Sequence, residues 1–452
     1  MPTASTRHAP QPSAAPRILL CATLRWPIAA RLAMAFAELG GRVEVLCPRG
    51  HPVTRTRAAT RIHRHSASRP LRSLEEALQS AEPDLIIPCD DDAALQLQRL
   101  HAQVDAADRP SPALRELIAR SLGAPEACLL ATTRGRLMAL AASLGIRVPN
   151  TRTVLTPQEL VAWLDGHALP AVIKIDGSWG GQGVAIVRSR EEARRAFERL
   201  AAPPSPAQAL ARTLLDRDSL PLRRRLAASR SVLTVQDFIA GEPANRAVAC
   251  WRGEVLAGTS VQALRTQQST GPATVVRVID NAEMDEAVRR LVQGLGLSGL
   301  WGVDFMLEAS TGAAHLIEMN PRATPISHLV PQPGHDLPAA LLSALGAWPA
   351  AAGRAAIGHE VIALFPGECR RDPASLHLRM DHHDVPWNEP DLVRDGLEAP
   401  WAERGWIARA WARWREPARN TPPRRDTAPD AYGSEQTLPA CADYNPLSRH
   451  TP

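Results

Sequence analysis

The chain has 452 residues, of which 45% are hydrophobic and 22% are charged, and its formal net charge is +5. This length allows more than one packed domain, and so small a basic surplus gives no reason to expect nucleic acid or an acidic membrane as a partner. No stretch approaches the roughly 20 apolar residues of a membrane-spanning helix, and the apolar run at 18–24 lacks a secretory cleavage site. The seven cysteines form no CxxC pair and no zinc-type spacing, so unpaired thiols are expected. The sequence therefore predicts a cytoplasmic protein with neither a nucleic-acid nor a membrane partner.

The N-terminal part predicts an α/β domain. Residues 1–15 are rich in Pro, Ala, Ser and Thr and are expected to form a disordered leader. Over 16–110, buried strands such as 18–22 alternate with helices such as 29–39, which is typical of a doubly wound, Rossmann-like sheet. Three aspartates at 90–92 follow a strand of this sheet. Contact with substrate is one interpretation, and capping of the next helix is the favoured one.

A second domain is predicted over 111–350, mostly helical at first and then rich in strands. A strand at 171–175, a glycine-rich turn and a returning strand at 184–187 lie inside an expected glycine-rich lid at about 150–235. A Pro- and Arg-rich stretch at about 203–230 is expected to be an insertion in this lid.

The C-terminal part predicts two further segments. Residues 351–416 are expected to form a small appendage, and residues 417–452, rich in Pro, Arg, Thr and Asp, a disordered tail. Tryptophans and arginines are mixed within 401–415. A helix on a membrane surface would explain them, but packing onto the protein body is favoured, because apolar residues there share one helical face.

Lys174 is the only lysine among the 52 basic residues of the chain. Arginine replaces lysine at little cost on a surface, but not where an ammonium must act as a compact point charge. Lys174 is followed by a turn with Gly180, Gly181 and Gly183, whose backbone N–H groups can surround phosphate oxygens because no side chain blocks them. The lysine and the glycines together predict a phosphate site, whereas the glycines alone would also suit an ordinary hairpin turn.

Three familiar phosphate-binding motifs do not fit this pattern. A P-loop requires Gly-Lys-Ser/Thr, but Lys174 lies between two isoleucines. A protein kinase has its glycine loop before the strand lysine, and here the loop follows the lysine. A dinucleotide-binding turn opens a helix, and the segment after this turn, 184–187, predicts a strand. The phosphate site therefore belongs to another class.

A second group of polar residues lies in a predicted hairpin at 300–320. Folding its strands about Thr311 brings residues of one strand directly opposite residues of the other. Two carboxylates that face each other in this way destabilise a hairpin unless a cation lies between them. The predicted pairs are Asp304 with Glu318, Met306 with Leu316, and Gly302 with Asn320.

Asp304, Glu318 and Asn320 are therefore candidate metal ligands. Asn320 shares the face of Glu318, because side chains two apart in a strand point the same way. Two carboxylates and an amide, without His or Cys, suit Mg²⁺ shared with substrate phosphates, and Mn²⁺ is the alternative ion. Arg322 follows on the same side and is a candidate to hold a transferring phosphoryl group or an oxyanion. Solvated carboxylates and a surface arginine are the alternative interpretation.

The order of these segments resembles the ATP-grasp superfamily of carboxylate–amine ligases, of the carbamoyl phosphate synthetase and biotin carboxylase type. The resemblance covers about residues 112–345 and depends on the strand lysine, the glycine-rich turn and the segments VQDFIAGEP and GVDF…HLIEMNPR. It implies an α+β ATP-grasp fold after the doubly wound domain, with ATP and Mg²⁺ between its subdomains. The implied roles are Lys174 on the α- and β-phosphates, Gly180, Gly181 and Gly183 over the triphosphate, Asp304, Glu318 and Asn320 on Mg²⁺, and Arg322 on phosphate or the intermediate.

The same resemblance implies further contacts to the nucleotide. Arg134 lies where many members carry another nucleotide-contacting lysine, and some members are similar in using arginine. Glu242 is the nearest candidate for the acid that binds the ribose. Members of the family hold the adenine at a hinge, through backbone groups and one acid. A segment of this chain resembles that hinge and consists of Gln236, Asp237, Phe238 and Ile239.

The activity implied by the resemblance is ATP-dependent ligation. A substrate carboxylate would be activated as an acyl phosphate and joined to an amine, with Lys174 and Arg322 as catalytic candidates. The partners would be small-molecule carboxylates and amines, and a homodimer is expected because many relatives are dimers. An ATP-dependent phosphotransferase on the same fold and a non-catalytic ATP-binding regulatory protein are the alternatives that the sequence leaves open.

Overall fold

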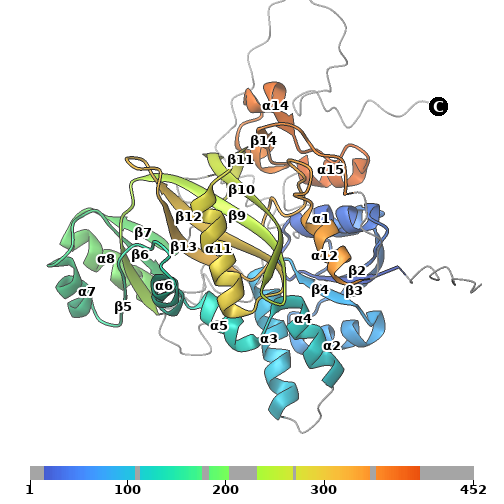
Figure 1. Cartoon of the computed structure of the whole chain (residues 1–452), viewed down its shortest axis with the longest axis horizontal. Coiled ribbons are helices and arrows are strands. Elements are labelled where there is room, and N and C mark those ends of the chain that lie inside the picture. Colours follow the sequence, from blue (N-terminus) through green and yellow to red (C-terminus); the bar gives the residue numbers. More distant parts are fainter. Residues whose placement is uncertain are drawn as a thin grey trace, which may run out of the picture.

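The computed structural model describes residues 15–106, 112–175, 183–202, 232–267, 271–346 and 353–397. These residues form three sheets, each with helices packed against it (Figure 1). No helix among them is both long and apolar enough to cross a membrane. Some expectations lie outside the described residues: the leader up to residue 14, Gly180, Gly181, the insertion at 203–230, the segment at 401–415 and the tail at 417–452.

The N-terminal sheet confirms the doubly wound prediction. Its parallel strands have the order β3-β2-β1-β4. In β1, Leu19 faces a core shared with α2 and α3, and Leu20 faces a core shared with α1, so helices cover both faces. The edge strand β3 is largely exposed and has no apolar alternation from which to predict it. The elements are β1 (Arg17–Cys21), α1 (Ile28–Glu38), β2 (Arg42–Cys47), a 3₁₀ helix (Pro52–Arg55), β3 (Ala59–Arg64), α2 (Pro70–Ala81), β4 (Leu85–Pro88) and α3 (Asp91–Ala106).

Three helices connect this sheet to the rest of the chain, as predicted: α4 (Pro112–Leu122), α5 (Pro125–Thr132) and α6 (Arg134–Ser143). Proline begins α4 and α5, where its missing N–H costs no hydrogen bond. Apolar residues of α5 and α6 are buried in the same core as strands of the large sheet. Because α6 begins at Arg134, this packing brings the arginine to the edge of that sheet.

The small sheet has the order β5-β8-β6-β7, and α7 and α8 cover one of its faces. In β6, Ala171 and Ile173 face these helices, so Lys174 points from the opposite face. The carbonyl of Gly183 accepts a hydrogen bond from the N–H of Ile175 (3.0 Å) and closes the predicted β6–β7 hairpin. The elements are β5 (Thr151–Val154), α7 (Pro157–Leu164), β6 (Ala171–Ile175), β7 (Val184–Val187), α8 (Arg190–Ala201) and β8 (Leu233–Asp237).

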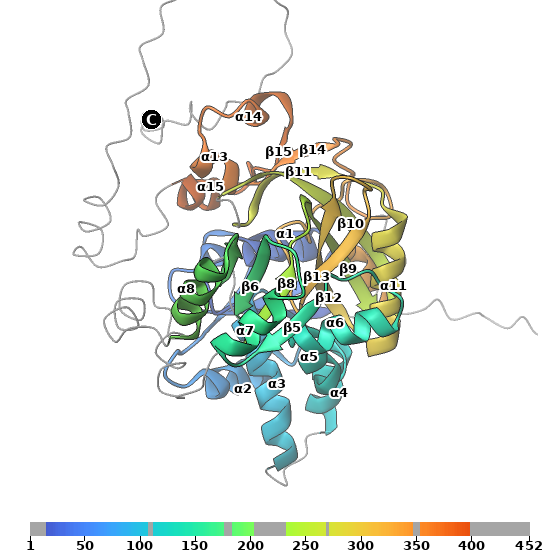
Figure 2. The same ribbon diagram turned by 90° about the vertical axis from the view of Figure 1, so that its left-hand side faces the viewer.

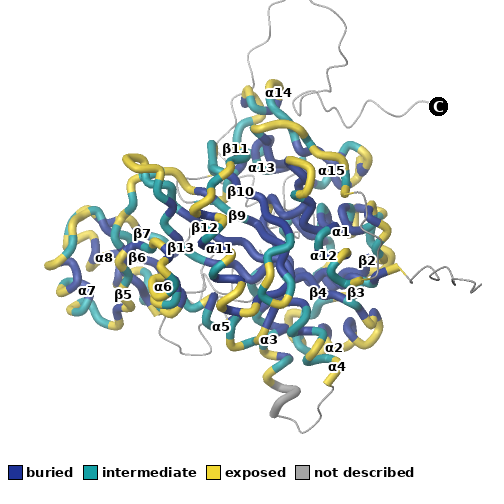
Figure 3. Tube along the Cα trace, in the orientation of Figure 1, coloured by how far each residue is buried: buried dark blue, intermediate teal, exposed yellow. Residues whose placement is uncertain are grey.

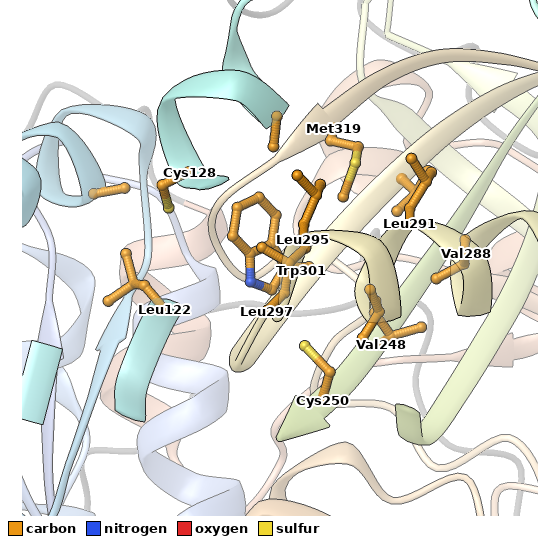
Figure 4. Close-up of a cluster of buried hydrophobic side chains, with 14 of the residues drawn as sticks. Leu122, Cys128, Val248, Cys250, Val288, Leu291, Leu295, Leu297, Trp301 and Met319 are labelled. Atoms are coloured by element: carbon orange, nitrogen blue, oxygen red, sulfur yellow. The ribbon is translucent and has the colours of Figure 1, made fainter. Parts of the chain in front are cut away.

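The large sheet has the order β13-β12-β9-β10-β11-β14-β15 and lies behind the small sheet in Figure 2. On one face α11 packs over Trp301, which is 1% exposed and surrounded by apolar side chains such as Leu295 and Leu297 (Figure 4). On the other face α12 packs toward the N-terminal sheet. The elements are β9 (Gly241–Trp251), β10 (Glu254–Thr266), β11 (Ala273–Val278), α11 (Ala282–Leu295), β12 (Gly299–Glu308), β13 (Ala314–Asn320) and α12 (Leu337–Ala344).

The register predicted for the β12–β13 hairpin is right up to Asp304 and wrong beyond it. A β-bulge after Asp304 shifts the pairing, so that Leu316 faces Phe305 instead of Met306, which faces His315. The bulge places Phe305 and Leu316 in the same buried core. The register therefore follows the burial of these two apolar side chains, which folding the strands symmetrically about Thr311 did not take into account.

The C-terminal region continues the large sheet, because β14 (Val361–Ala363) pairs with β11 and then with β15 (His382–His383). Figure 3 shows its buried residues facing the sheet and exposed residues on its outer side. Among the described cysteines, Cys21, Cys47, Cys89, Cys128 and Cys250 are buried free thiols, as predicted. For Cys369 the prediction is wrong, since this cysteine is disulfide-bonded. The helices are α13 (Gly367–Arg371), α14 (His377–Met380) and α15 (Pro390–Leu397).

Candidate active site

Lys174 is buried on the inner face of the small sheet and is 8% exposed. Burial lowers the pKa of Lys174 to about 8, and the charge of Arg134 adds to the lowering. The carboxylates of Glu318 and Asp304 act in the opposite direction and favour the charged ammonium. These mutual effects mean that the lysine of the small sheet and the carboxylates of the large sheet lie together, as the sequence predicted.

Asp304 and Glu318 are direct cross-strand neighbours in the β12–β13 hairpin. The two oxygens of Asp304 accept hydrogen bonds from side-chain amides, Oδ1 from Asn245 (2.6 Å) and Oδ2 from Asn320 (2.9 Å). Burial and the adjacent Glu318 carboxylate raise the pKa of Asp304 to about 6, although the two amides counteract this rise. The hairpin therefore holds two acids that repel each other.

Arg134 reaches this hairpin from α6, 184 residues earlier in the chain. Its Nη2 donates to Glu318 Oε2 at 2.8 Å, and the side chain is 8% exposed. Burial alone would raise the pKa of Glu318, but Arg134 and Lys174 together lower it below its ordinary value. Of the two acids, Glu318 is thus the one whose pKa is lowered, whereas the pKa of Asp304 is raised.

Arg322 follows β13 and is 9% exposed. Its Nε donates to Asp91 Oδ2 (2.8 Å), and its Nη2 donates to Asn320 Oδ1 (3.2 Å). The guanidinium carbon lies 4.7 Å from the centroid of the Trp26 ring, a cation–π contact. Since Asp91 and Trp26 belong to the N-terminal part, this part, the small sheet and the large sheet all contribute side chains to one group.

A divalent cation fits the oxygen donors of Asp304, Glu318 and Asn320. The raised pKa of Asp304 reflects its burial and also a repulsion between carboxylates, and such a cation would remove the repulsion. Within the described residues, no group of three or more His, Cys, Asp or Glu side chains could hold a metal ion. A metal at this hairpin would therefore need the Asn320 amide and oxygens from a ligand, a mode that Mg²⁺ commonly adopts with phosphates.

The predicted nucleoside residues are arranged differently. The side chain of Gln236 is buried and donates to Thr151 Oγ1 (2.9 Å), so it is already used inside the small sheet. Asp237 Oδ2 accepts a hydrogen bond from Asn150 (2.5 Å). Phe238 is 36% exposed, and the side chain of the exposed residue Glu242 has no described hydrogen bond. Ile239 follows as a half-buried residue between β8 and β9.

Gly241 explains how this segment enters the large sheet. A Cβ at this position would lie 1.9 Å from the carbonyl oxygen of Leu307 on β12. Only glycine allows so close an approach of the two backbones. The turn from the small sheet to the large sheet therefore depends on a residue that the sequence analysis did not single out.

Three residues that contact the charged side chains of this site were not assigned to it from the sequence: Asn245, Trp26 and Asp91. Asn245 had a detectable signal, because it lies near the predicted hinge and just before the apolar run that ends its strand at Trp251, from which only Arg246 separates it. Trp26 had none. Asp91 belongs to the aspartates at 90–92, and the favoured capping role is confirmed for Asp90, whose Oδ1 accepts from the N–H of Ala93 (2.9 Å).

Residues 138–325 match the model of a protein family described as an ATP-grasp domain. Over 174 residues the chain is 30% identical to acetyl-CoA carboxylase 2 of Oryza sativa subsp. japonica. That alignment covers 37% of this chain and 6% of the rice protein, so the chain spans only a small fraction of this relative.

Solved structures of low sequence identity show the same fold. N5-carboxyaminoimidazole synthetase of Staphylococcus aureus with ADP is 15% identical, with a TM-score of 0.50 over 70% of this chain and 72% of that one. The biotin carboxylase domain dimer of the Hydrogenobacter thermophilus 2-oxoglutarate carboxylase, with MgADP and bicarbonate, is 15% identical, with a TM-score of 0.53 over 73% and 69%. Biotin carboxylase of Campylobacter jejuni is 14% identical, with a TM-score of 0.51 over 75% and 71%.

Proposed function

We propose that residues 138–325, which match the model of an ATP-grasp domain, make the protein an ATP-dependent carboxylate–amine ligase. The observation that supports the proposal most strongly is the convergence of Lys174, Arg134 and Arg322 on the carboxylates of Asp304 and Glu318. Three basic side chains around two carboxylates suit a ligand that is a polyanion and carries a bound metal ion.

Lys174 and Arg134 bind the phosphates of ATP in this proposal, and Gly180, Gly181 and Gly183 lie over the triphosphate. The buried ammonium of Lys174 has no described hydrogen-bond acceptor, so a phosphate oxygen would supply one. Phosphate binding would also restore the ordinary pKa of the ammonium, because the nearby negative charge favours its protonated form.

Asp304, Glu318 and Asn320 would hold Mg²⁺, with Mn²⁺ as a second ion to test. The metal would supply charge neutralisation on the phosphate oxygens during phosphoryl transfer. What the chain itself contributes is the geometry: Asn245 and Asn320 fix the two oxygens of Asp304, and Arg134 fixes Glu318. This arrangement is prepared before the nucleotide binds.

Arg322 would bind the phosphoryl group and the acyl phosphate that forms from it. The substrate carboxylate attacks the γ-phosphorus of ATP and releases ADP, and an amine then displaces phosphate from the acyl phosphate to give an amide. Arg322 suits both steps, because its planar fork holds phosphate oxygens while Asn320 and Asp91 fix its orientation.

The nucleoside would bind at the segment of Gln236, Asp237, Phe238, Ile239 and Glu242. Since the side chain of Gln236 is committed to Thr151, backbone groups of the segment would contact the adenine. The exposed Glu242 is free to reach the ribose.

Further features are proposed with this function. The doubly wound domain at 16–110, the ATP-grasp domain at 111–350 and the appendage at 351–416 are proposed as units of the chain. The substrates are small-molecule carboxylates and amines in the cytoplasm. A homodimer is proposed because the similar domain from Hydrogenobacter thermophilus is a dimer.

The experiment that tests the function is a screen for ADP release with MgATP. Bicarbonate and the standard amino acids serve as carboxylates, and ammonia, hydroxylamine and the amino acids serve as amines. We expect at least one pair to release ADP and to yield an amide by mass spectrometry. A phosphate ester as product would identify a phosphotransferase, and MgATP binding without ADP release from any pair would identify a regulatory protein.

A further inference from the structure

Asp91 is the one of the three aspartates at 90–92 that neither caps nor pairs within its own helix. Asp90 accepts from the N–H groups of Thr23 and Ala93, and Asp92 accepts from Gln96. Asp91 points instead to a residue 231 positions later, Arg322. It lies just beyond the carboxyl end of β4, where open α/β sheets gather their ligands.

The contact with Arg322 uses only half of the Asp91 carboxylate. Oδ2 accepts from Arg322 Nε at 2.8 Å, whereas no described residue donates a hydrogen bond to Oδ1. The side chain is 32% exposed, so a ligand can reach this second oxygen. The ring of Trp26 packs against the same guanidinium and limits the space around it.

The other carboxylates of the site face different partners. Both oxygens of Asp304 accept from amides, and Glu318 faces Arg134 and Lys174. These two acids therefore face the basic side chains that are proposed to bind the nucleotide. Asp91 lies on the side of the N-terminal domain and contacts the site through Arg322.

We propose, on the premise of the ligase function above, that Asp91 binds the nitrogen nucleophile of the ligation and accepts its proton. The nitrogen adds to the carbonyl carbon of the acyl phosphate, whose phosphate end Arg322 holds. The N–H proton passes to Asp91 Oδ1, the C–O bond to phosphate breaks, and inorganic phosphate leaves with the bonding electrons. Asp91 is thus a catalytic residue of the second half of the reaction and not of the first.

The variant Asp91→Asn separates these two halves. Its amide oxygen can still accept from Arg322 Nε, but the NH₂ group in place of Oδ1 cannot receive a proton. With a pair from the screen above, we expect amide formation to fall about 10²-fold, the lower range for loss of a general base. ADP release with the carboxylate alone, and MgADP affinity by calorimetry, should stay within about twofold of wild type.

The matched control is Asp84→Asn at the opposite end of β4, which removes the same charge from a residue paired with Arg17. It should leave both halves of the reaction unchanged. Asp91→Glu should recover at least part of the amide formation, and it also serves if Asp91→Asn fails to fold.

Several outcomes would overturn the proposal. Unchanged amide formation in Asp91→Asn would show that the carboxylate receives no proton. An equal loss in carboxylate-dependent ADP release would show that Asp91 acts only by positioning Arg322. A wild-type protein that releases no ADP with any pair would instead remove the ligase premise, and the role of Asp91 with it.

Discussion

The two ends of the proposed nucleotide site differ in how the chain forms them. At the phosphate end, Lys174, Arg134 and Arg322 surround two carboxylates, and most of these groups are buried. At the nucleoside end, Gln236 is used inside the small sheet, and Phe238 and Glu242 are exposed.

The difference follows from what each end recognises. A polyphosphate with its cation requires fixed charges of both signs, and fixed charges require particular side chains. A base and a sugar can be held by backbone groups and apolar contact, which many side chains permit. Substitutions at the phosphate end should therefore have large effects, and substitutions at the nucleoside end small ones.

The largest effect is expected for Lys174→Ala. Removing the buried ammonium should lower nucleotide-dependent turnover by about 10³-fold, because a preorganised charge in a dry site contributes several kcal/mol. Steady-state ADP release measures the loss. Lys174→Arg is the informative control, since it keeps the charge but not the compact shape, and we expect it to remain severely impaired. Turnover like that of wild type in Lys174→Ala would refute the assignment.

The next largest effect is expected for Asp304→Asn. Loss of one carboxylate should reduce ADP release roughly 10²-fold and raise the Mg²⁺ concentration needed for half-maximal rate, because metal charge stabilisation contributes several kcal/mol. Glu308→Gln, at the C-terminal end of the same strand, removes an equal charge and should behave as wild type. If both variants require the same Mg²⁺ concentration, the hairpin does not bind the metal.

A smaller effect is expected from the pH dependence of stability without nucleotide. The pKa of Lys174 is lowered from 10.5 to about 8, so between these values the unfolded chain binds a proton that the folded protein does not. Stability relative to Lys174→Met should therefore rise with pH, by about 2 kcal/mol between pH 8 and pH 10. Urea unfolding of both proteins at the two pH values measures this difference. A difference that falls with pH would mean that the pKa is raised instead.

The smallest effect is expected for Glu242→Gln at the nucleoside end. The glutamine keeps a side-chain oxygen that can accept a hydrogen bond from the ribose, so MgATP affinity should change by less than about threefold. Calorimetry with MgATP and MgGTP would also show whether base selectivity changes. A tenfold loss would mean that this end is defined by a side chain after all.

The sequence was most informative where partners are close in the chain. The pair Asp304–Glu318 was predicted because a single turn joins the two strands. The prediction failed at Met306, where a bulge changed the register in favour of a buried Phe305. Apolar burial depends on the three-dimensional core, which a local pairing rule does not contain.

Contacts between distant segments were beyond the reach of sequence patterns. Arg134 bonds to Glu318 across 184 residues, and Asp91 bonds to Arg322 across 231. The resemblance indicated that Arg134 belongs to the site, but no spacing rule indicated which acid it meets. For Asp91 the sequence favoured helix capping, which its neighbour Asp90 performs.

The central claim is that the buried ammonium and the acidic hairpin bind one polyphosphate through a divalent cation. Calorimetry of ATP binding with and without Mg²⁺, in wild type, Lys174→Ala and Glu318→Gln, tests it most directly. We expect Mg²⁺ to strengthen binding at least about tenfold in wild type, hardly at all in Glu318→Gln, and Lys174→Ala to weaken binding under both conditions. A full Mg²⁺ effect in Glu318→Gln, or unchanged affinity in Lys174→Ala, would contradict it.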